Sequence, residues 1–280
     1  MAPSPKPGAT PPQTPCCLHL FSGDASRPDG IAAYLREAEW DTRDVDIVNA
    51  SSDPQGSAAH DLSSDALWTE LFESVAAGAF RCVFMGTPCE TFSRARTGPP
   101  GPRPLRTAQS PYGLPRGSLT EREFEQVRLG TYFALQSCRM AQAAIRAGVP
   151  WGLENPEPMG NPVSLFALPE FQDLAESRDV RVSDFDQCHL GAGSKKPTRV
   201  LSWGLDLRAL EGRCPHPPTP QEWVGRRGEK VSGVVRHPPL IGKDASGAFK
   251  TKAAAAYPAP MNRVLAAAIA TSSPSGAQGV

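Results

Sequence analysis

Residues 80–96 read FRCVFMGTPCETFSRAR and carry the signal that most strongly indicates the fold. The apolar run over 80–86 is typical of a buried strand, and Gly-Thr-Pro-Cys then leads into a tight turn. A cysteine on such a turn is exposed and rigidly held, because Pro88 fixes the chain that approaches it. Cys89 is therefore our candidate nucleophile, although an arbitrary cysteine near a strand end more often belongs to core packing.

Short apolar runs on both sides of this stretch alternate with helical patterns. We predict further strands at 16–23, 43–50, 149–155, 180–186 and 198–203. Apolar residues at helical spacing predict helices at 29–40, 65–77, 120–147 and 252–270. Strands that alternate with crossover helices predict an α/β fold with a mostly parallel, doubly wound sheet, which binds ligands beyond the carboxyl ends of its strands.

The composition is that of a folded protein. Of the 280 residues, 40% are hydrophobic and 21% are charged, which excludes a fully disordered chain. No run approaches the roughly 18 apolar residues of a membrane span, and the first twenty residues do not resemble a signal peptide. The seven cysteines are an odd number and scattered, which favours reduced thiols. We therefore expect an intracellular protein without membrane contact, in the nucleus if eukaryotic and otherwise in the cytoplasm.

The zero net charge conceals a division along the chain. Residues 20–90 hold four Arg and no Lys against thirteen acids, whereas residues 191–263 hold thirteen Lys and Arg against five acids. Residues 94–116 add five Arg and no acid. This division suits a cationic small ligand on one side and a phosphate backbone on the other, although solvated surfaces produce it too.

Composition also divides the chain into parts. Proline-rich residues 1–15 and residues 271–280 are predicted to be disordered tails, because neither can bury enough apolar area. Residues 94–119, rich in Pro, Gly and Arg, are predicted to form a mobile surface loop. We expect a catalytic domain at 16–203, a small irregular lobe at 204–252 and a helix at 253–270 that packs back on the domain.

Five motifs in order resemble those of the cytosine-C5 DNA methyltransferases, particularly compact, phage-like members with Glu-Asn-Pro and Lys-Pro-Thr variants. The motifs are HLFSGDAS at 19–26, GTPCETFS at 86–93, WGLENPEP at 151–158, KKPTRVLSWG at 195–204 and AYPAPMNRVLAAAIA at 256–270. Each is short, but five in order make a specific signal. The resemblance covers roughly residues 18–270 and implies a Rossmann-like fold whose cofactor is S-adenosylmethionine.

The resemblance also implies catalytic roles. Cys89 would add to C6 of cytosine, which converts the ring to an enamine that accepts a methyl group at C5. Glu154, in an apolar setting behind Trp151 and Leu153, would donate a proton or hydrogen bond to cytosine N3. Glu157 is the neighbouring acid that could be mistaken for it. Arg199 would bind the cytosine O2 or a phosphate.

The cofactor residues follow from the same motifs. Phe21, Ser22 and Gly23 lie in the turn after the first strand, Asp46 would bind the ribose hydroxyls and Ile47 would lie against adenine. Asp44 stays open as a substitute for Asp46. The remaining candidates for cofactor binding are Asp61, Pro88 and Asn262.

The substrate is expected to be DNA, with RNA as the open alternative because the ring chemistry is identical. A target cytosine must leave the duplex stack to be reached, and the Arg-rich loop 94–116 would close over it. Groove contacts would come from 204–252, and we expect a monomer. The predicted substrate contacts are Ser93, Arg94, Arg96, Asn155, Lys196 and Thr198, with Arg94 and Arg96 also favouring the Cys89 thiolate.

Two departures from the family's pattern and one metal question remain. Ala25 and Pro197 stand where a glycine and an arginine are expected, so a nucleic-acid-binding relic without turnover is a third hypothesis. Cys188, Cys214 and His216 resemble zinc ligands, but no fourth ligand follows at ordinary spacing. We therefore predict no metal site, and a basic surface cluster stays an alternative for the residues around Arg199.

Overall fold

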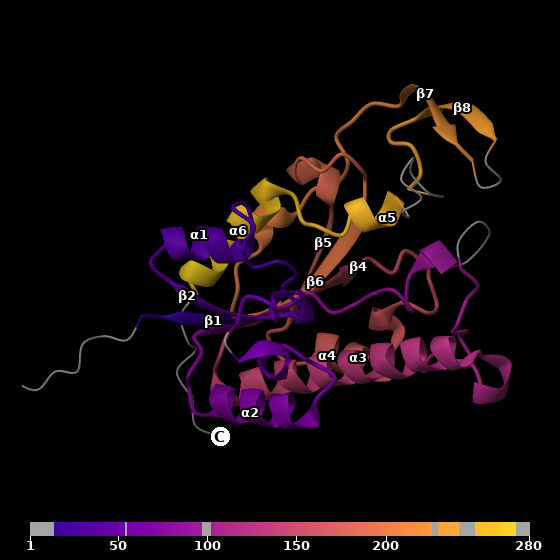
Figure 1. Cartoon of the computed structure of the whole chain (residues 1–280). Coiled ribbons are helices and arrows are strands. Elements are labelled where there is room, and N and C mark those ends of the chain that lie inside the picture. Colours follow the sequence, from indigo (N-terminus) through magenta and orange to yellow (C-terminus); the bar gives the residue numbers. More distant parts are fainter. Residues whose placement is uncertain (1–13, 54, 97–101, 226–228, 241–249, 273–280) are drawn as a thin grey trace, which may run out of the picture.

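The computed structural model describes residues 14–53, 55–96, 102–225, 229–240 and 250–272, and has a six-stranded central sheet (Figure 1). The strand order is β2-β1-β3-β4-β6-β5. Only β6 runs antiparallel to its neighbours β4 and β5. The strands are β1 (Cys16–Leu20), β2 (Asp41–Val45), β3 (Cys82–Met85), β4 (Trp151–Pro156), β5 (Arg181–Asp186) and β6 (Pro197–Trp203).

Helices cover both faces of this sheet. On one face lie α2 (Asp65–Ala76), α3 (Glu121–Ala147) and α4 (Pro169–Glu176), and on the other lie α1 (Ile31–Glu37) and α6 (Ala259–Ala270) (Figure 1). Each face has its own buried apolar core. The predicted α/β class with a mostly parallel sheet is confirmed, and the architecture is compatible with a Rossmann-like fold.

Local sequence explains the longest helix. The Thr120 side chain accepts from the Glu123 amide and the Glu123 side chain accepts from the Thr120 amide, a reciprocal cap for two exposed donors. Gly148, with φ of 70°, then ends α3 in the left-handed conformation that glycine adopts at low cost. Both signals are present in the sequence as Thr-Glu-Arg-Glu at 120–123 and Gly148.

Three expectations about irregular regions were wrong. Residues 204–252 contain a hairpin of β7 (Thr219–Val224) and β8 (Lys230–Val235), and α4 was not predicted. The single helix expected at 252–270 is divided into α5 (Lys250–Ala253) and α6, because Pro258 caps the second helix. The tails expected at 1–15 and 271–280 lie almost entirely outside the described residues.

Buried hydrogen bonds join the described part of the loop 94–119 to the rest of the protein. Arg106 is only 2% exposed, and its guanidinium donates to the Thr91 and Thr131 hydroxyls and to the Pro111 and Val127 carbonyls. It also lies 3.8 Å from the centroid of the Phe92 ring. This arginine therefore fastens the loop to α3. In the described part of the chain, no helix is long and apolar enough to cross a bilayer.

Candidate functional site

The candidate site lies where β1, β3 and β4 end and β6 begins. The loop of residues 86–93, here the Pro-Cys loop, follows β3 and approaches the turn after β1 closely. A Cβ atom on Gly86 would lie 3.2 Å from both the Phe21 carbonyl oxygen and the Tyr257 hydroxyl. The glycine thus lets two backbone segments and a tyrosine meet at one point.

Two hydrogen bonds hold the Pro-Cys loop. The Thr87 hydroxyl donates to the Ser137 hydroxyl on α3 at 2.9 Å, and the Asn155 side-chain amide donates to the Thr87 carbonyl at 2.6 Å. Asn155, predicted to contact substrate, is 2% exposed and therefore positions the loop instead. The loop is fastened on both sides, to α3 and to β4.

Cys89 as a whole residue is partly exposed, while its thiol lies in a largely buried setting. Burial raises the pKa of the Cys89 thiol to about 11, with a further contribution from the negative charge of Glu154. The positive charge of Lys196 acts in the opposite direction. The structure thus gives Lys196 the role that the sequence argument gave to Arg94 and Arg96.

Glu154 is 6% exposed on β4 and has one satisfied and one unsatisfied oxygen. Its Oε2 accepts a hydrogen bond from the Tyr257 hydroxyl at 2.8 Å. Its Oε1 has no hydrogen-bond partner among the residues that the structure describes. A buried polar oxygen without a partner is costly, so this atom is suited to a ligand group that completes its hydrogen bonding.

Tyr257 is a site residue that the sequence argument missed. Burial, followed by the charge of Glu154, raises the pKa of its hydroxyl well above the ordinary value. It therefore remains a hydrogen-bond donor at any ordinary pH. The only signal in the sequence was its place in the motif at 256–270, directly before the proline that caps α6.

Lys196 completes the group of side chains around the thiol. Its ammonium lies 5.4 Å from the centroid of the Tyr257 ring. Its backbone φ of 30° is uncommon for a residue with a Cβ atom, and such strain is typical of functional positions. Lys196 also lines a groove of about 550 Å³, whose other wall includes Val234 and His237 at the end of the hairpin.

Arg199 does not join this group. Register pairs Asn155 with Arg199 and Glu154 with Val200, and successive side chains on a strand point to opposite faces. Arg199 therefore lies on the opposite face of the sheet from Glu154. Its guanidinium donates to both carboxylate oxygens of Asp184 at 2.7 and 2.8 Å. Its predicted catalytic role is not compatible with this arrangement.

The turn after β1 has a shape fixed by the loop after β2. The Asp46 carboxylate accepts from the amides of Gly23 and Val48, at 3.0 and 3.2 Å. The Asn49 side chain, which the sequence argument missed, donates to the Ser22 hydroxyl and the Gly23 carbonyl. Asp46 thus shapes the predicted cofactor loop.

Other predicted cofactor residues lie around the same turn or farther from it. Phe21, with φ of 55°, packs edge-on against Phe133 on α3, and Ile47 is 55% exposed beside Asp46. The alternative acid Asp44 is buried and paired with His19 at 2.9 Å, which favours Asp46 over it. Pro88 is half-buried beside Cys89.

The last two cofactor candidates make contacts within the protein. Asp61 accepts from the amide and hydroxyl of Ser63. Asn262 on α6 donates to the Asp29 carbonyl at 2.7 Å, while its Oδ1 is buried and has no partner among the described residues. Asn262 therefore has one atom left for a ligand, whereas Asp61 mainly caps a turn.

The predicted substrate residues are mostly engaged. The Ser93 hydroxyl accepts from the Ala95 amide, and Thr198 is fully buried. Arg96 donates to the Glu90 and Arg103 carbonyls, so it braces the loop rather than extending into solvent. Arg94 also takes part in an interaction within the protein.

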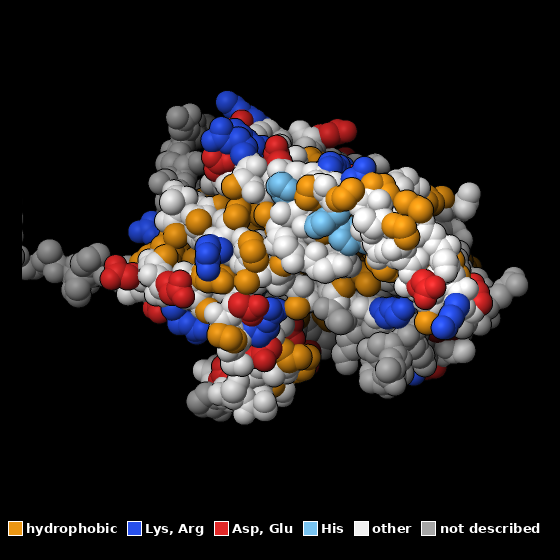
Figure 2. Space-filling view, turned by 90° about the horizontal axis from the view of Figure 1, so that it is seen from above, with side chains coloured by type: hydrophobic (Ala, Val, Ile, Leu, Met, Phe, Trp, Pro, Cys, Tyr) orange, Lys and Arg blue, Asp and Glu red, His pale blue; other side chains and the backbone are white. Residues whose placement is uncertain are grey.

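Two of the described arginines in the basic range 204–252 are paired with acids. Arg213 pairs with Glu157, and Arg208 pairs with Asp206. On the side that carries α1, α6 and the hairpin, basic and acidic side chains are interspersed (Figure 2). Arg226, Arg227 and Lys243, which were expected to contact the groove of DNA, lie outside the described residues.

Cys188, Cys214 and His216, for which no fourth ligand follows at ordinary spacing in the sequence, have a fourth neighbour of metal-binding type in the structure. His237, 21 residues beyond His216, brings a ring nitrogen within 3.3 Å of the His216 Nδ1. The sequence argument looked for a ligand at short spacing, whereas the hairpin returns the chain to the cluster.

A comparison of the chain with models of protein families finds no match, and a comparison with curated proteins finds none either.

Proposed function

We propose that this protein is an S-adenosylmethionine-dependent methyltransferase that modifies C5 of cytosine in DNA, acting as a monomer. The observation that carries the proposal is the group formed by Cys89, Glu154, Lys196 and Tyr257. It joins the thiol of a partly exposed cysteine to a buried carboxylate with one unsatisfied oxygen and to a cation. The five ordered motifs at 19–26, 86–93, 151–158, 195–204 and 256–270 support the same reading.

The turn after β1 fits the cofactor. Positive φ values at Phe21 and Gly23 turn the backbone sharply, and nothing lies within 4 Å of a Cβ placed on Gly23. The exposed Ile47 offers an apolar surface for a base, and the unpartnered Oδ1 of Asn262 offers an acceptor. When bound, S-adenosylmethionine supplies an electrophilic methyl group. These residues would hold it beside the Pro-Cys loop.

Proton placement links the thiol to the carboxylate. The charge of Glu154 raises the pKa of Cys89, so the thiol is neutral at rest. A transfer of the thiol proton to Glu154 would remove that charge at the moment the thiolate forms, and Lys196 would stabilise the thiolate. The proton on Glu154 would then be available for transfer to N3 of cytosine.

The proposed reaction follows from this placement. The Cys89 sulfur forms a bond to C6 of cytosine while Glu154 donates its proton to N3, so the ring becomes an enamine. C5 takes up the methyl group. A base then removes the C5 proton, the bond between sulfur and C6 breaks, and the thiolate leaves. As the thiolate leaves, N3 returns its proton to Glu154, from which Cys89 recovers it, so the product is neutral 5-methylcytosine and both side chains are restored.

Substrate access is the remaining requirement. A cytosine within a duplex cannot be attacked at C6, so the base must rotate out of the stack. The groove of about 550 Å³ beside Lys196 lies in the size range of ligand pockets, roughly 300–1,000 Å³. Lys195 and Lys196 on its wall support contact with a phosphate backbone.

Covalent trapping tests the proposal. Duplex DNA containing 5-fluorocytosine should form a stable adduct with the intact chain and S-adenosylmethionine, because fluorine at C5 blocks the elimination. Cys89→Ser should abolish the adduct, while Cys16→Ser, a control at a thiol outside the site, should retain it. No adduct with the intact chain on either DNA or RNA would refute the enzyme, and methyl transfer to transfer RNA alone would refute DNA as the substrate.

A further inference from the structure

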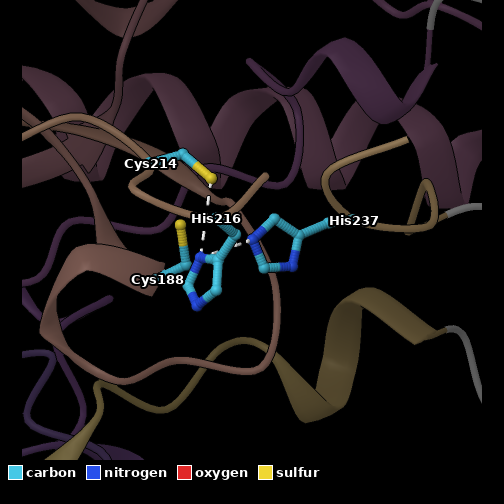
Figure 3. A group of neighbouring side chains, drawn as sticks. All are labelled: Cys188, Cys214, His216 and His237. Atoms are coloured by element: carbon cyan, nitrogen blue, oxygen red, sulfur yellow. Dashed lines mark hydrogen bonds between the residues drawn. The ribbon is translucent and has the colours of Figure 1, made fainter. Parts of the chain in front are cut away.

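Four side chains of metal-binding type converge beside the hairpin, outside the candidate catalytic site. They are Cys188, Cys214, His216 and His237, and their ligand atoms all lie within 4.8 Å of one another (Figure 3). Cys188 lies in the short helical turn after β5, Cys214 and His216 lie between β6 and β7, and His237 follows β8. The cluster therefore joins three segments that are separate in the sequence.

We propose that these four residues bind a zinc ion. Thiolate sulfur and imidazole nitrogen are the ligands that zinc prefers, and two of each form a closed tetrahedral set. Because the set leaves no open position for water or substrate, the ion is structural and takes no part in the proposed methyl transfer. The inference does not depend on that proposed function.

The spacing of the ligand atoms fits a tetrahedron. Bonds of about 2.0–2.3 Å to the corners of a tetrahedron separate ligand atoms by roughly 3.3–3.8 Å. The Cys214 Sγ lies 3.6 Å from the His216 Nδ1, and the His237 Nε2 lies 3.3 Å from that same nitrogen. Small shifts of side chains would bring the remaining pairs into range.

Hydrogen bonds alone do not account for the convergence. The His216 Nδ1 faces both a sulfur and a second ring nitrogen, and a single nitrogen of a neutral ring either donates one proton or accepts. It therefore cannot satisfy both neighbours as a donor. One cation at the centre would satisfy all four atoms at once, after the two thiols lose their protons.

The backbone around the ligands is already fixed. The buried carboxylate of Asp186, at the end of β5, accepts from the Cys214 amide at 2.8 Å. Arg236, next to His237, donates to the carbonyls of Cys214 and His216 at 3.2 and 2.8 Å. Supporting contacts of this kind orient the ligands of metal sites.

The position of the ion defines its effect on the molecule. His237 and Lys196 both line the groove beside the catalytic site, and Cys188 lies in the turn that directly follows β5 of the central sheet. A zinc ion here would fasten the hairpin to the sheet and thereby fix one wall of the groove. Figure 1 shows the hairpin extending away from the helical layers, so the ion would add to the hydrogen bonds of Asp186 and Arg236 in orienting it.

Metal analysis of the full chain tests the site. Protein purified without chelators should contain about one zinc ion per chain by mass spectrometry, and cobalt exchange should give the intense visible absorption of a tetrahedral thiolate site. Cys214→Ser and His237→Asn should each lose most of the bound metal. His189→Asn is the matched control, since this exposed histidine is adjacent to Cys188 but is not part of the cluster.

A second measurement separates metal loss from misfolding. After chelation, the far-ultraviolet circular dichroism should stay nearly unchanged, while trypsin should cleave at least tenfold faster at Lys230 and Arg236 in the released hairpin. Negligible bound zinc in the wild-type protein after zinc has been added to it would overturn the proposal. So would full metal content in Cys214→Ser and His237→Asn, or a disulfide between Cys188 and Cys214 in place of metal.

Discussion

The charge of Glu154 adds to the effect of burial in lowering the reactivity of Cys89, and replacing the carboxylate by an amide tests this contribution directly. The pKa of Cys89 is raised from the ordinary value of 9.0 to about 11, mainly by burial and then by Glu154. At pH 8 this lowers the thiolate fraction from about 10% to about 0.1%, a difference of roughly 100-fold. Alkylation of Cys89 by iodoacetamide should be slower than that of a free thiol by this factor.

Glu154→Gln removes the negative charge and keeps the shape. The pKa of Cys89 should fall, so alkylation at pH 8 should accelerate by about threefold to tenfold, since one pKa unit corresponds to a factor of ten. Lys196→Met removes the cation that favours the thiolate and should slow the reaction. Glu157→Gln, three positions along the chain and paired with Arg213, is the matched control and should react like the unaltered protein.

Peptide mass spectrometry can follow Cys89 separately from the other six cysteines, over pH 7 to 11. The half-maximal rate of the unaltered protein should be reached well above pH 9. A midpoint at or below pH 9, or a Glu154→Gln rate equal to or below that of the control, would refute the electrostatic coupling on which the proton transfer rests.

Three further predictions concern residues outside the reacting group. Arg106→Met should lower the free energy of unfolding by about 2–4 kcal/mol in urea titrations, because buried acceptors lose their donor, whereas exposed Arg103→Met should destabilise the protein far less. Equal losses would contradict the role of Arg106 in holding the loop. Asn155→Ala should cost about 1–3 kcal/mol and slow formation of the 5-fluorocytosine adduct, because the Pro-Cys loop loses its anchor, and an unchanged adduct rate would count against that anchor. Arg199→Met should destabilise the sheet edge by roughly 1 kcal/mol yet keep adduct formation within about threefold, whereas abolition of the adduct in a folded variant would restore the catalytic role rejected above.

Much of the fold was accessible from the sequence because its signals are local. All six sheet strands lie within or beside the predicted ranges, and the caps of α3 are complete in the sequence. α4 was missed since it spans only eight residues and begins at a proline. The hairpin was missed because its strands are exposed and weakly apolar, so apolar and polar residues do not alternate clearly enough to indicate a strand.

The site was predicted less completely, because its membership depends on contacts between distant segments. Cys89 and Glu154 lie at strand ends, where topology alone places functional groups. Arg199 was misassigned because strand register decides which face a side chain occupies, and register is not visible in one strand. Tyr257 reaches the site from the segment between α5 and α6, and His237 reaches its cluster from the segment after the hairpin, far along the chain from their partners.

The reversed direction of β6 has a consequence for the order in which this protein assembles. β5 and β6 are joined by a short connection and pair as neighbours, so their contacts close a small loop. Each parallel pair is instead joined by a longer segment that contains at least one helix, so its strands meet only after a larger loop has closed. We expect this pair to form early during refolding. Cys188 lies in that connection, so the first of the proposed zinc ligands would be in place before the hairpin that carries the last one has docked.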